Sequence, residues 1–296
     1  MASGCLRPFS RIPFDTRRSV KILFTRKARS RVCIGGFWLV IGGCAVLPGS
    51  SWRPGWNEEW KSKDAPPETA ASWKLTELET KDNRFLGLAI SGGGSRAANF
   101  GAAVMLELQQ RKLPEQFDVI SGVSGGTLPA VYYSLGQKAG GFTEPVLRKA
   151  LGYDFQASWL RRWFLPQNIF RYWLSDFTRS DIMVQVFNNE LYHDAMFKDL
   201  QSRPKILLNS TIHNDHTRYT FTDERFSRLG SALAFYPVAN AVNASSAFPG
   251  AFQDVTLEWY MTPREYVHLY DGGPIDNLGV QAISEYINRN ILSKSM

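Results

Sequence analysis

Residues Phe117–Gly126 read FDVISGVSGG, an apolar run followed by a turn rich in glycine. The run Phe117–Ile120 is typical of a buried strand, and the residues from Thr127 onward, TLPAVYYSLG, are typical of a helix. Gly122–Gly126 fits the pattern G-x-S-x-G, and a strand, a sharp turn and a helix are the context in which this pattern exposes a nucleophilic serine. We therefore predict that Ser124 lies at a nucleophile elbow in strained backbone.

The glycines around Ser124 fit the same prediction. Gly122 and Gly126 flank the turn, where side chains would collide, and Gly125 directly follows the serine. The helix that starts here presents free N–H groups, which stabilise nearby negative charge. Turns of glycine and serine also join strands to helices in proteins without any such activity, so the motif needs support from the rest of the chain.

The charge and cysteine content limit the kinds of function. The chain has 296 residues, enough for one large α/β domain, and a net charge of +7. Residues 1–31 hold nine Lys and Arg against one acid, so the remainder has a net charge of −1 and offers no basic face for nucleic acid. The last cysteine is Cys44 and the histidines form no H-E-x-x-H pattern, so we predict neither a metal nor a cofactor.

The N-terminal region has the features of an export signal. Val32–Leu47 is uncharged and follows a basic segment, as in the apolar core of a signal peptide. Ile41-Gly42-Gly43-Cys44 resembles a bacterial lipobox, which implies cleavage before Cys44 and attachment of lipid to it. Ala45 in the next position favours the outer membrane. The alternative is an uncleaved anchor in the inner membrane.

These features predict three regions. Residues 1–43 form a leader, residues 44–82 form a lipidated cysteine and a polar tether, and residues 83–296 form the folded domain. The chain ends at Met296, soon after its last recognisable motif, so a truncated C-terminus is also expected.

A second glycine-rich loop precedes the elbow. The expected strand Phe85–Ile90 leads into Gly92-Gly93-Gly94-Ser95-Arg96, and a helix is expected over Ala97–Gln110. The loop formally fits a dinucleotide-binding pattern, but the acidic residue required at the end of the next strand is missing, and a P-loop would need Gly-Lys-Ser/Thr. We predict an oxyanion hole formed by Gly92, Gly93 and Gly94, brought to the elbow by adjacent parallel strands.

Several further elements are expected from periodicity and composition. Gly140–Leu200 is rich in aromatic residues interleaved with arginine, which fits a core, the wall of an acyl pocket or an interfacial surface. The other predicted elements are a helix over Asp181–Tyr192 capped by Ser180, strands at Lys205–Ile212 and Arg218–Thr222, a helix over Ala239–Ala247 and a last strand, Tyr266–Tyr270.

A serine nucleophile needs a base, and Asp271 is the best candidate. Asp271-Gly272-Gly273 follows the last predicted strand, at the kind of strand end where open α/β sheets place their chemistry. No histidine follows Asp271, so a Ser124–Asp271 dyad is predicted, with Asp271 taking the serine proton. The alternatives are a Ser-His-Asp esterase that uses His268 and a catalytically inert, membrane-tethered lipid-binding protein.

Three motifs resemble those of the patatin-like phospholipases, in the same order along the chain. They are Gly92–Arg96, Gly122–Gly126 and Asp271–Gly273, and the segment Ser245–Pro249 is also similar. The resemblance implies a three-layer α/β/α sandwich with a mostly parallel sheet. It also implies metal-independent, phospholipase A-type hydrolysis of acyl esters in membrane lipids. Arg96 would then hold the loop or face a lipid phosphate.

Overall fold

The computed structural model describes residues 56–72, 85–113, 117–263 and 265–292. These residues belong to one compact unit, Ser51–Met296. The predicted leader, Cys44 and the first part of the predicted tether lie outside the described residues.

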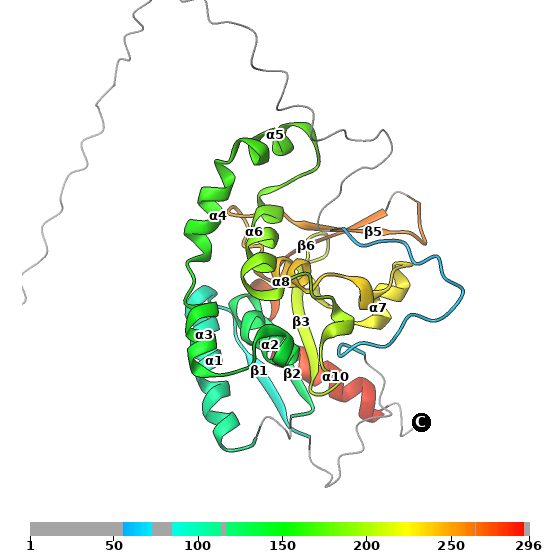
Figure 1. Cartoon of the computed structure of the whole chain (residues 1–296). Helices are drawn as coiled ribbons and strands as arrows, with labels where there is room; N and C mark the ends of the chain where they lie inside the picture. Colours follow the sequence, from blue (N-terminus) through cyan, green and yellow to red (C-terminus); the bar gives the residue numbers. More distant parts are fainter. Residues whose placement is uncertain (1–55, 73–84, 114–116, 264, 293–296) are drawn as a thin grey trace, which may run out of the picture. The chain divides into compact units, whose positions relative to one another are not determined.

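The central sheet has six strands, which Figure 1 shows in sequence colours. They are β1 (Gly87–Ile90), β2 (Val119–Val123), β3 (Lys205–Ile212), β4 (Arg218–Thr220), β5 (Val255–Trp259) and β6 (Glu265–Asp271). The strand order is β1-β2-β3-β6-β5, and β4 pairs with β3. The predicted strand over residues 205–212 is confirmed with the same bounds.

The helices are α1 (Gly94–Gln110), α2 (Thr127–Leu135), α3 (Glu144–Leu151), α4 (Phe155–Trp163), α5 (Pro166–Leu174), α6 (Arg179–Phe187), α7 (Asp223–Arg228), α8 (Val238–Ser246), α9 (Gly273–Asp276) and α10 (Val280–Leu292). Within the described part of the chain, no helix is both long and apolar enough to cross a bilayer.

The strands that lead into the glycine-rich loop and into the turn at Ser124 are parallel. β1, β2 and β3 are parallel neighbours, as predicted for the strands that carry the two motifs. β6 runs antiparallel to β3 and β5 antiparallel to β6. Val123 at the end of β2 aligns with Asn209, and β3 continues past this point to pair Ser210 with Asp271. Asp271 therefore reaches the end of β2 from the opposite direction.

Alternating side chains of the sheet form two apolar layers. Val119 and Leu207 pack on one face with Tyr286 of α10. Ile120 and Leu208 point to the other face and belong to the main core, which includes residues of α1, α2 and α8. Because side chains of a strand alternate with a period of two, both faces are covered, and the fold is the predicted α/β/α sandwich (Figure 1).

The N-terminus of α6 corrects a sequence prediction. A helix over 181–192 with Ser180 as its cap was expected, but α6 begins at Arg179 and Thr178 caps it. The Thr178 hydroxyl accepts from the N–H of Asp181 at 3.4 Å, and the Asp181 carboxylate accepts from the N–H of Thr178 at 2.7 Å. This reciprocal capping box satisfies two free N–H groups at once, which a single serine cap does not.

Part of the predicted tether, residues 44–82, is packed against the domain. The side chain of Asn57 hydrogen-bonds both the N–H and the C=O of Glu258, at 2.7 and 3.1 Å. Ala70 is buried in the main core. Residues 56–72 are therefore part of the folded unit, and the prediction of a tether over that range was wrong.

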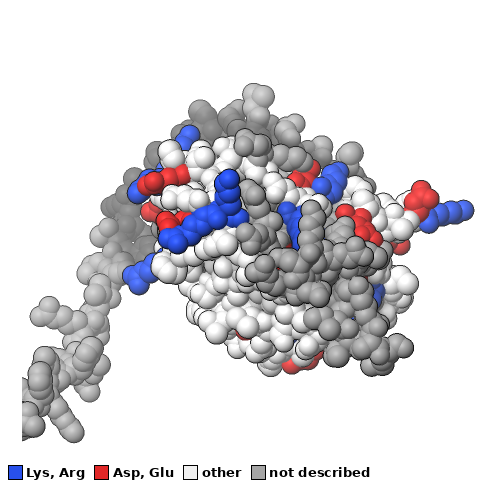
Figure 2. All heavy atoms as spheres, turned by 90° about the horizontal axis from the view of Figure 1, so that it is seen from below, with Lys and Arg blue, Asp and Glu red and all other residues white. Residues whose placement is uncertain are grey.

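The face shown in Figure 2 carries basic and acidic side chains close to each other. Exposed ion pairs also link positions four residues apart, such as Glu107 of α1 with Arg111 directly after it and Glu144 with Arg148 on α3. Such exposed pairs contribute at most about 1 kcal/mol each to the free energy of unfolding. They make the domain surface polar but do not position the site described next.

Candidate active site

Ser124 lies at a sharp turn between β2 and α2. Its φ angle is 48°, in the left-handed region that a residue with a side chain rarely adopts. Residues Ser124–Gly126 form a 3-10 turn that leads directly into α2 at Thr127. The strand, turn and helix are thus arranged as the sequence predicts, and the strain falls on the serine.

Ser245 at the end of α8 holds the backbone of this turn in place. Its hydroxyl accepts a hydrogen bond from the N–H of Ser124 at 2.9 Å and donates to the carbonyl oxygen of Asn209 at 2.5 Å. The carbonyl of Ser245 also accepts from the N–H of Gly272 at 3.2 Å. One buried residue therefore links the turn at Ser124, strand β3 and the segment that carries Asp271.

The glycine-rich loop touches the turn through its backbone. A Cβ atom added to Gly125 would lie 2.0 Å from the carbonyl oxygen of Gly94, so only glycine permits this approach. Gly93 and Gly94 have positive φ angles of 143° and 60°, and α1 begins at Gly94. The free N-terminal amides of α1 therefore start beside Ser124.

Gly92 has a different role from the one predicted. Its N–H donates to the carbonyl oxygen of Asn277 at 2.9 Å, so this N–H is not available to a substrate. A Cβ atom at Gly92 would lie 2.4 Å from Oδ1 of Asn277, so the glycine makes room for that contact. Arg96 is exposed on the first turn of α1 and is not among the residues that line the pocket described below.

The other predicted glycines are packing positions. Gly122 faces the backbone of Thr127, Gly126 faces the carbonyl of Ile90, and Gly272 faces the carbonyl of Asn209, each at a distance that excludes a side chain. They let β1, β2 and β3 come together with the turns that leave them.

Asp271 is buried at the end of β6 and its backbone is fixed on two sides. Its N–H donates to the carbonyl of Ala247 at 3.0 Å, and its carbonyl accepts from the Thr211 hydroxyl at 2.9 Å. Its carboxylate accepts from the N–H of Gly273 at 2.7 Å. Burial raises the pKa of Asp271 above its ordinary value, while hydrogen bonds from Gly273 and from the Ser124 side chain lower the pKa in part.

Ser124 and Asp271 line one pocket of about 530 Å³. Gly93, Gly94 and Gly125 lie at the same pocket. Most of the remaining wall is apolar and comes from Leu128, Phe155, Met183, Phe187, Phe248 and Phe252. A hydroxyl, a carboxylate and glycine backbone therefore meet beside a cavity that suits an apolar chain.

His268 lies elsewhere. Its Nδ1 atom is 3.0 Å from the hydroxyl of Thr256 on the neighbouring strand β5, and it is not among the residues that line the Ser124 pocket. The described residues contain no group of three or more His, Cys, Asp or Glu side chains that could hold a metal ion.

Sequence reasoning missed Asn277 and the role of Ser245. Asn277 lines the pocket and its carbonyl binds the glycine-rich loop. Its position in DGGPIDN, the run that begins at Asp271, is the signal that could have indicated it. Ser245 lies in the segment Ser245–Pro249, which resembles a segment of the patatin-like phospholipases. No local sequence pattern shows that its hydroxyl reaches the turn at Ser124.

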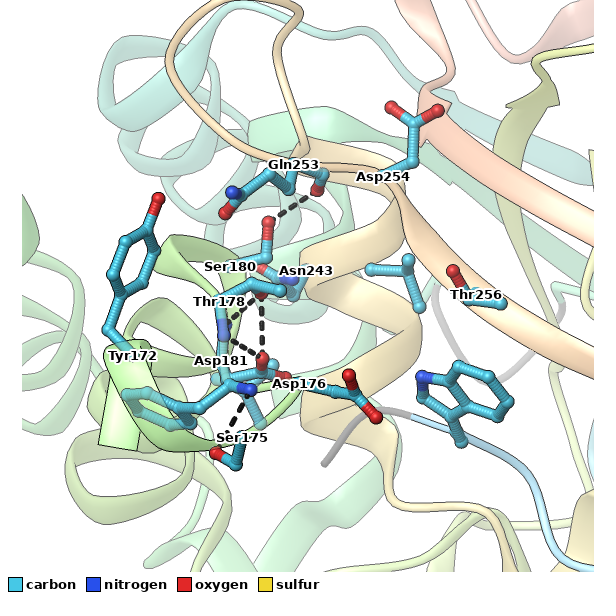
Figure 3. Close-up of a pocket in the computed structure, with 14 residues that line it drawn as sticks. Tyr172, Ser175, Asp176, Thr178, Ser180, Asp181, Asn243, Gln253, Asp254 and Thr256 are labelled. Atoms are coloured by element: carbon cyan, nitrogen blue, oxygen red, sulfur yellow. Dashed lines mark hydrogen bonds between the residues drawn. The ribbon is translucent and has the colours of Figure 1, made fainter. Parts of the chain in front are cut away.

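A second pocket, of about 430 Å³, lies against the other side of α6 (Figure 3). Met183 and Phe187 of this helix line the Ser124 pocket, whereas Asp181 and Val184 line the second one. In Figure 3 the Ser180 hydroxyl donates to the backbone carbonyl of Gln253. Neither Ser124 nor Asp271 lines this pocket.

The Asp181→Asn variant is expected to lose part of the pH dependence of stability. Burial raises the pKa of Asp181 to about 6 in the folded protein, whereas it stays near its ordinary value of about 4 in the unfolded chain. The folded state therefore keeps a proton that the unfolded state loses as pH rises. The contribution of Asp181 to the free energy of unfolding should fall by roughly 2–3 kcal/mol between about pH 4 and pH 6 and be constant above that range.

Asparagine does not titrate, and its carbonyl can still accept the hydrogen bonds of Thr178. The difference in free energy of unfolding between the variant and the wild type should therefore grow in favour of the variant between acid and neutral pH. Denaturant unfolding of both proteins, at about pH 4 and again above about pH 6, measures this difference. Equal differences at both values would contradict the assignment.

Comparisons with known proteins place this site in a family. A sequence model described as patatin-like phospholipase matches residues 88–283. No curated protein matches the chain.

Similar solved structures include human GIVD cytosolic phospholipase A2, with a TM-score of 0.45, 15% sequence identity and coverage of 70% of this chain and 42% of that chain. The same human protein in complex with methyl gamma-linolenyl fluorophosphonate gives a TM-score of 0.38, 17% identity and coverage of 57% and 30%. VipD from Legionella pneumophila gives a TM-score of 0.37, 14% identity and coverage of 65% and 46%.

This chain spans less than half the length of each of those structures. The family match includes the glycine-rich loop, the turn at Ser124 and the segment at Asp271. The chain belongs to the patatin-like phospholipase family.

Proposed function

We propose that this protein is a serine lipid acyl hydrolase of the phospholipase A type. One observation carries the proposal: Ser124, in strained backbone, and Asp271, with a raised pKa, line the same apolar pocket. Membership of the patatin-like phospholipase family supports lipid esters as the substrate class.

In the proposed mechanism Asp271 accepts the proton of Ser124 as the hydroxyl oxygen attacks the ester carbonyl. The tetrahedral intermediate collapses, the alcohol of the lipid leaves with the proton that Asp271 had accepted, and the acyl group stays on Ser124. Water then attacks the acyl-enzyme and gives a proton to Asp271, and that proton passes to the Ser124 oxygen as the fatty acid is released. The carboxylate must be ionised at both attacks, and burial makes it a stronger base than an exposed aspartate.

The backbone N–H groups of Gly93, Gly94 and Gly125 are the proposed oxyanion donors, because these residues line the pocket beside Ser124. Charge develops on the carbonyl oxygen in the transition state, and fixed donors stabilise it there; one such donor typically contributes about 10²- to 10³-fold in rate. Gly92 is omitted because its N–H is already bonded to Asn277.

The proposed substrate is a phospholipid or another acyl-ester lipid at a membrane, and the reaction needs no metal or cofactor. The apolar wall formed by residues such as Phe155, Phe187 and Phe252 would hold the acyl chain. Lipid attachment at Cys44 and a place at the outer membrane or its periplasmic side remain proposals from the sequence, as does the alternative of an inner-membrane anchor.

Incubating the purified full chain with phospholipid vesicles should release a free fatty acid and a lysophospholipid, which mass spectrometry identifies. His268→Ala should keep turnover within about threefold, because His268 bonds Thr256 and does not line the pocket. Products cut at the head group, such as diacylglycerol, would refute a phospholipase A. Loss of turnover in the His268 variant would favour the triad instead.

A further inference from the structure

The helices α4 and α5 present an apolar outer surface. Five large apolar side chains on these helices, or directly after α4, are more than half exposed: Leu160, Phe164, Phe170, Trp173 and Leu174. We refer to these five as the α4–α5 face. Trp173 and Leu174 are 79% and 81% exposed, and Figure 1 shows α5 at the edge of the domain, away from the sheet. Several exposed apolar groups together on one surface mark a contact site for another molecule or a membrane.

The polarity of α5 is inverted relative to an ordinary surface helix. Its buried residue is Asn168, 3% exposed, whose amide donates to the carbonyl of Arg162 at 2.7 Å. Phe170 and Leu174 lie four residues apart and share one face of the helix, which points away from that bond. The inward hydrogen bond therefore fixes the apolar side chains outward.

The charge of this region suits an anionic lipid surface. The two helices and the residues between them contain no acidic residue and three arginines, Arg161, Arg162 and Arg171. Arg161 and Arg171 are exposed to solvent, and Arg162 also pairs with Glu190 at 3.4 Å. Aromatic and aliphatic groups beside exposed arginines are typical of surfaces that lie in the headgroup region of a bilayer.

A row of rings joins this region to the Ser124 pocket. Phe252 lines the pocket, and its ring centroid is 5.4 Å from that of Trp159 on α4. Trp159 is 5.4 Å from Trp163, and Trp163 is 5.8 Å from Tyr172 on α5. Phe248, at the same pocket, is itself mostly exposed. The apolar wall of the pocket is thus continuous with the two helices.

We infer that the α4–α5 face docks the protein on an anionic lipid bilayer. The large apolar side chains enter the interface, the arginines contact anionic headgroups, and the pocket lies beside the membrane that holds its substrate. This inference rests on the proposed function only in that the bilayer supplies the substrate, and docking itself can be measured without turnover.

The direct test places an environment-sensitive fluorophore at position 173 of the full chain. The three cysteines, Cys5, Cys33 and Cys44, are changed to serine, and Trp173→Cys adds a single labelling site. Met261→Cys is the matched control, because Met261 is 70% exposed but lies in the turn between β5 and β6. The uncharged segment at residues 32–47 can hold the chain on a vesicle by itself, so the position of the label, not binding, is diagnostic.

With vesicles of phosphatidylcholine and phosphatidylglycerol, the fluorescence emission of the label at position 173 should shift to shorter wavelength and be quenched by a lipid-bound quencher. The emission of the label at position 261 should not change. The inference fails if the label at 173 stays in water while the protein is on the vesicle. It also fails if that label is already shielded before vesicles are added, because another part of the protein then covers the face.

Turnover gives a second, independent readout. Changing Phe170, Trp173 and Leu174 together to serine should lower hydrolysis of vesicle lipid by at least about tenfold, because each side chain loses its burial in the interface. Hydrolysis of a dissolved short-chain ester should stay within about twofold of wild type, as should both activities of Met261→Ser. Equal loss on both substrates would overturn the docking role. Absence of any hydrolysis by the wild type would refute the proposed function and leave the fluorescence result to decide the docking.

Discussion

Ser124→Ala should lower kcat/KM for a dissolved short-chain ester by about 10⁴-fold or more. The variant lacks the atom that forms the acyl-enzyme, so only binding and oxyanion stabilisation remain to accelerate hydrolysis by water. The pocket itself should keep its shape, because the N–H of residue 124 still donates to Ser245 and Gly125 still packs on Gly94. The measurement is the steady-state rate of purified wild type and variant.

A fluorophosphonate probe gives the matching chemical readout. Wild type should become covalently labelled at Ser124, and the variant should remain unlabelled. Thermal unfolding of both proteins serves as the control for folding, since alanine at φ 48° meets the same backbone strain as serine. Turnover near the wild-type level in a folded, unlabelled variant would refute Ser124 as the nucleophile.

Asp271→Asn should lower kcat/KM by about 10³- to 10⁴-fold. Asparagine can keep the hydrogen bond from Gly273 but cannot accept the proton of Ser124. Asp181→Asn is a matched control, because Asp181 is also buried with a raised pKa but lines the other pocket. Its activity should stay close to that of wild type. If Asp271→Asn kept most of its activity, another group would have to be the base.

The pH profile of the wild type adds a test with a defined sign. Asp271 must be ionised to take a proton, so kcat/KM should fall as pH drops through its pKa. Because burial raises that pKa, the acid limb should lie at higher pH than expected for an exposed aspartate. The double variant Ser124→Ala/Asp271→Asn should hydrolyse the ester no more slowly than Ser124→Ala alone. The effects of residues that act as one unit on the rate are not additive.

Local patterns predicted the elements that carry the candidate site. A buried run followed by a glycine-rich turn indicated β2 and Ser124, and the segment KILLNSTI was predicted as a strand with the bounds that β3 has in the structure. Two motifs after successive strands were expected to meet if those strands were parallel neighbours, and β1 and β2 are. The covering of both sheet faces also follows from alternation along the strands.

Other features depend on contacts between distant segments. The loss of Gly92 as an oxyanion donor depends on Asn277, and the support of the turn depends on Ser245. α6 begins at Arg179 because a reciprocal capping box forms at Thr178, although Ser180 is also a good cap by composition. Periodicity also could not say whether the aromatic residues near 160–174 are buried or exposed.

The amino-acid sequence alone indicated Ser124 and Asp271 as the candidate reacting groups, and it indicated the tight turn around Ser124, because the flanking glycines stand where a side chain would collide. It also determined the family. The fold decided how Asp271 reaches Ser124: β6 runs antiparallel to β3, and β3 extends past the end of β2, a register that depends on pairing across some 60 residues of chain. It also decided which way α5 faces, because that orientation is fixed by packing and by the bond of Asn168 to Arg162 and not by local periodicity.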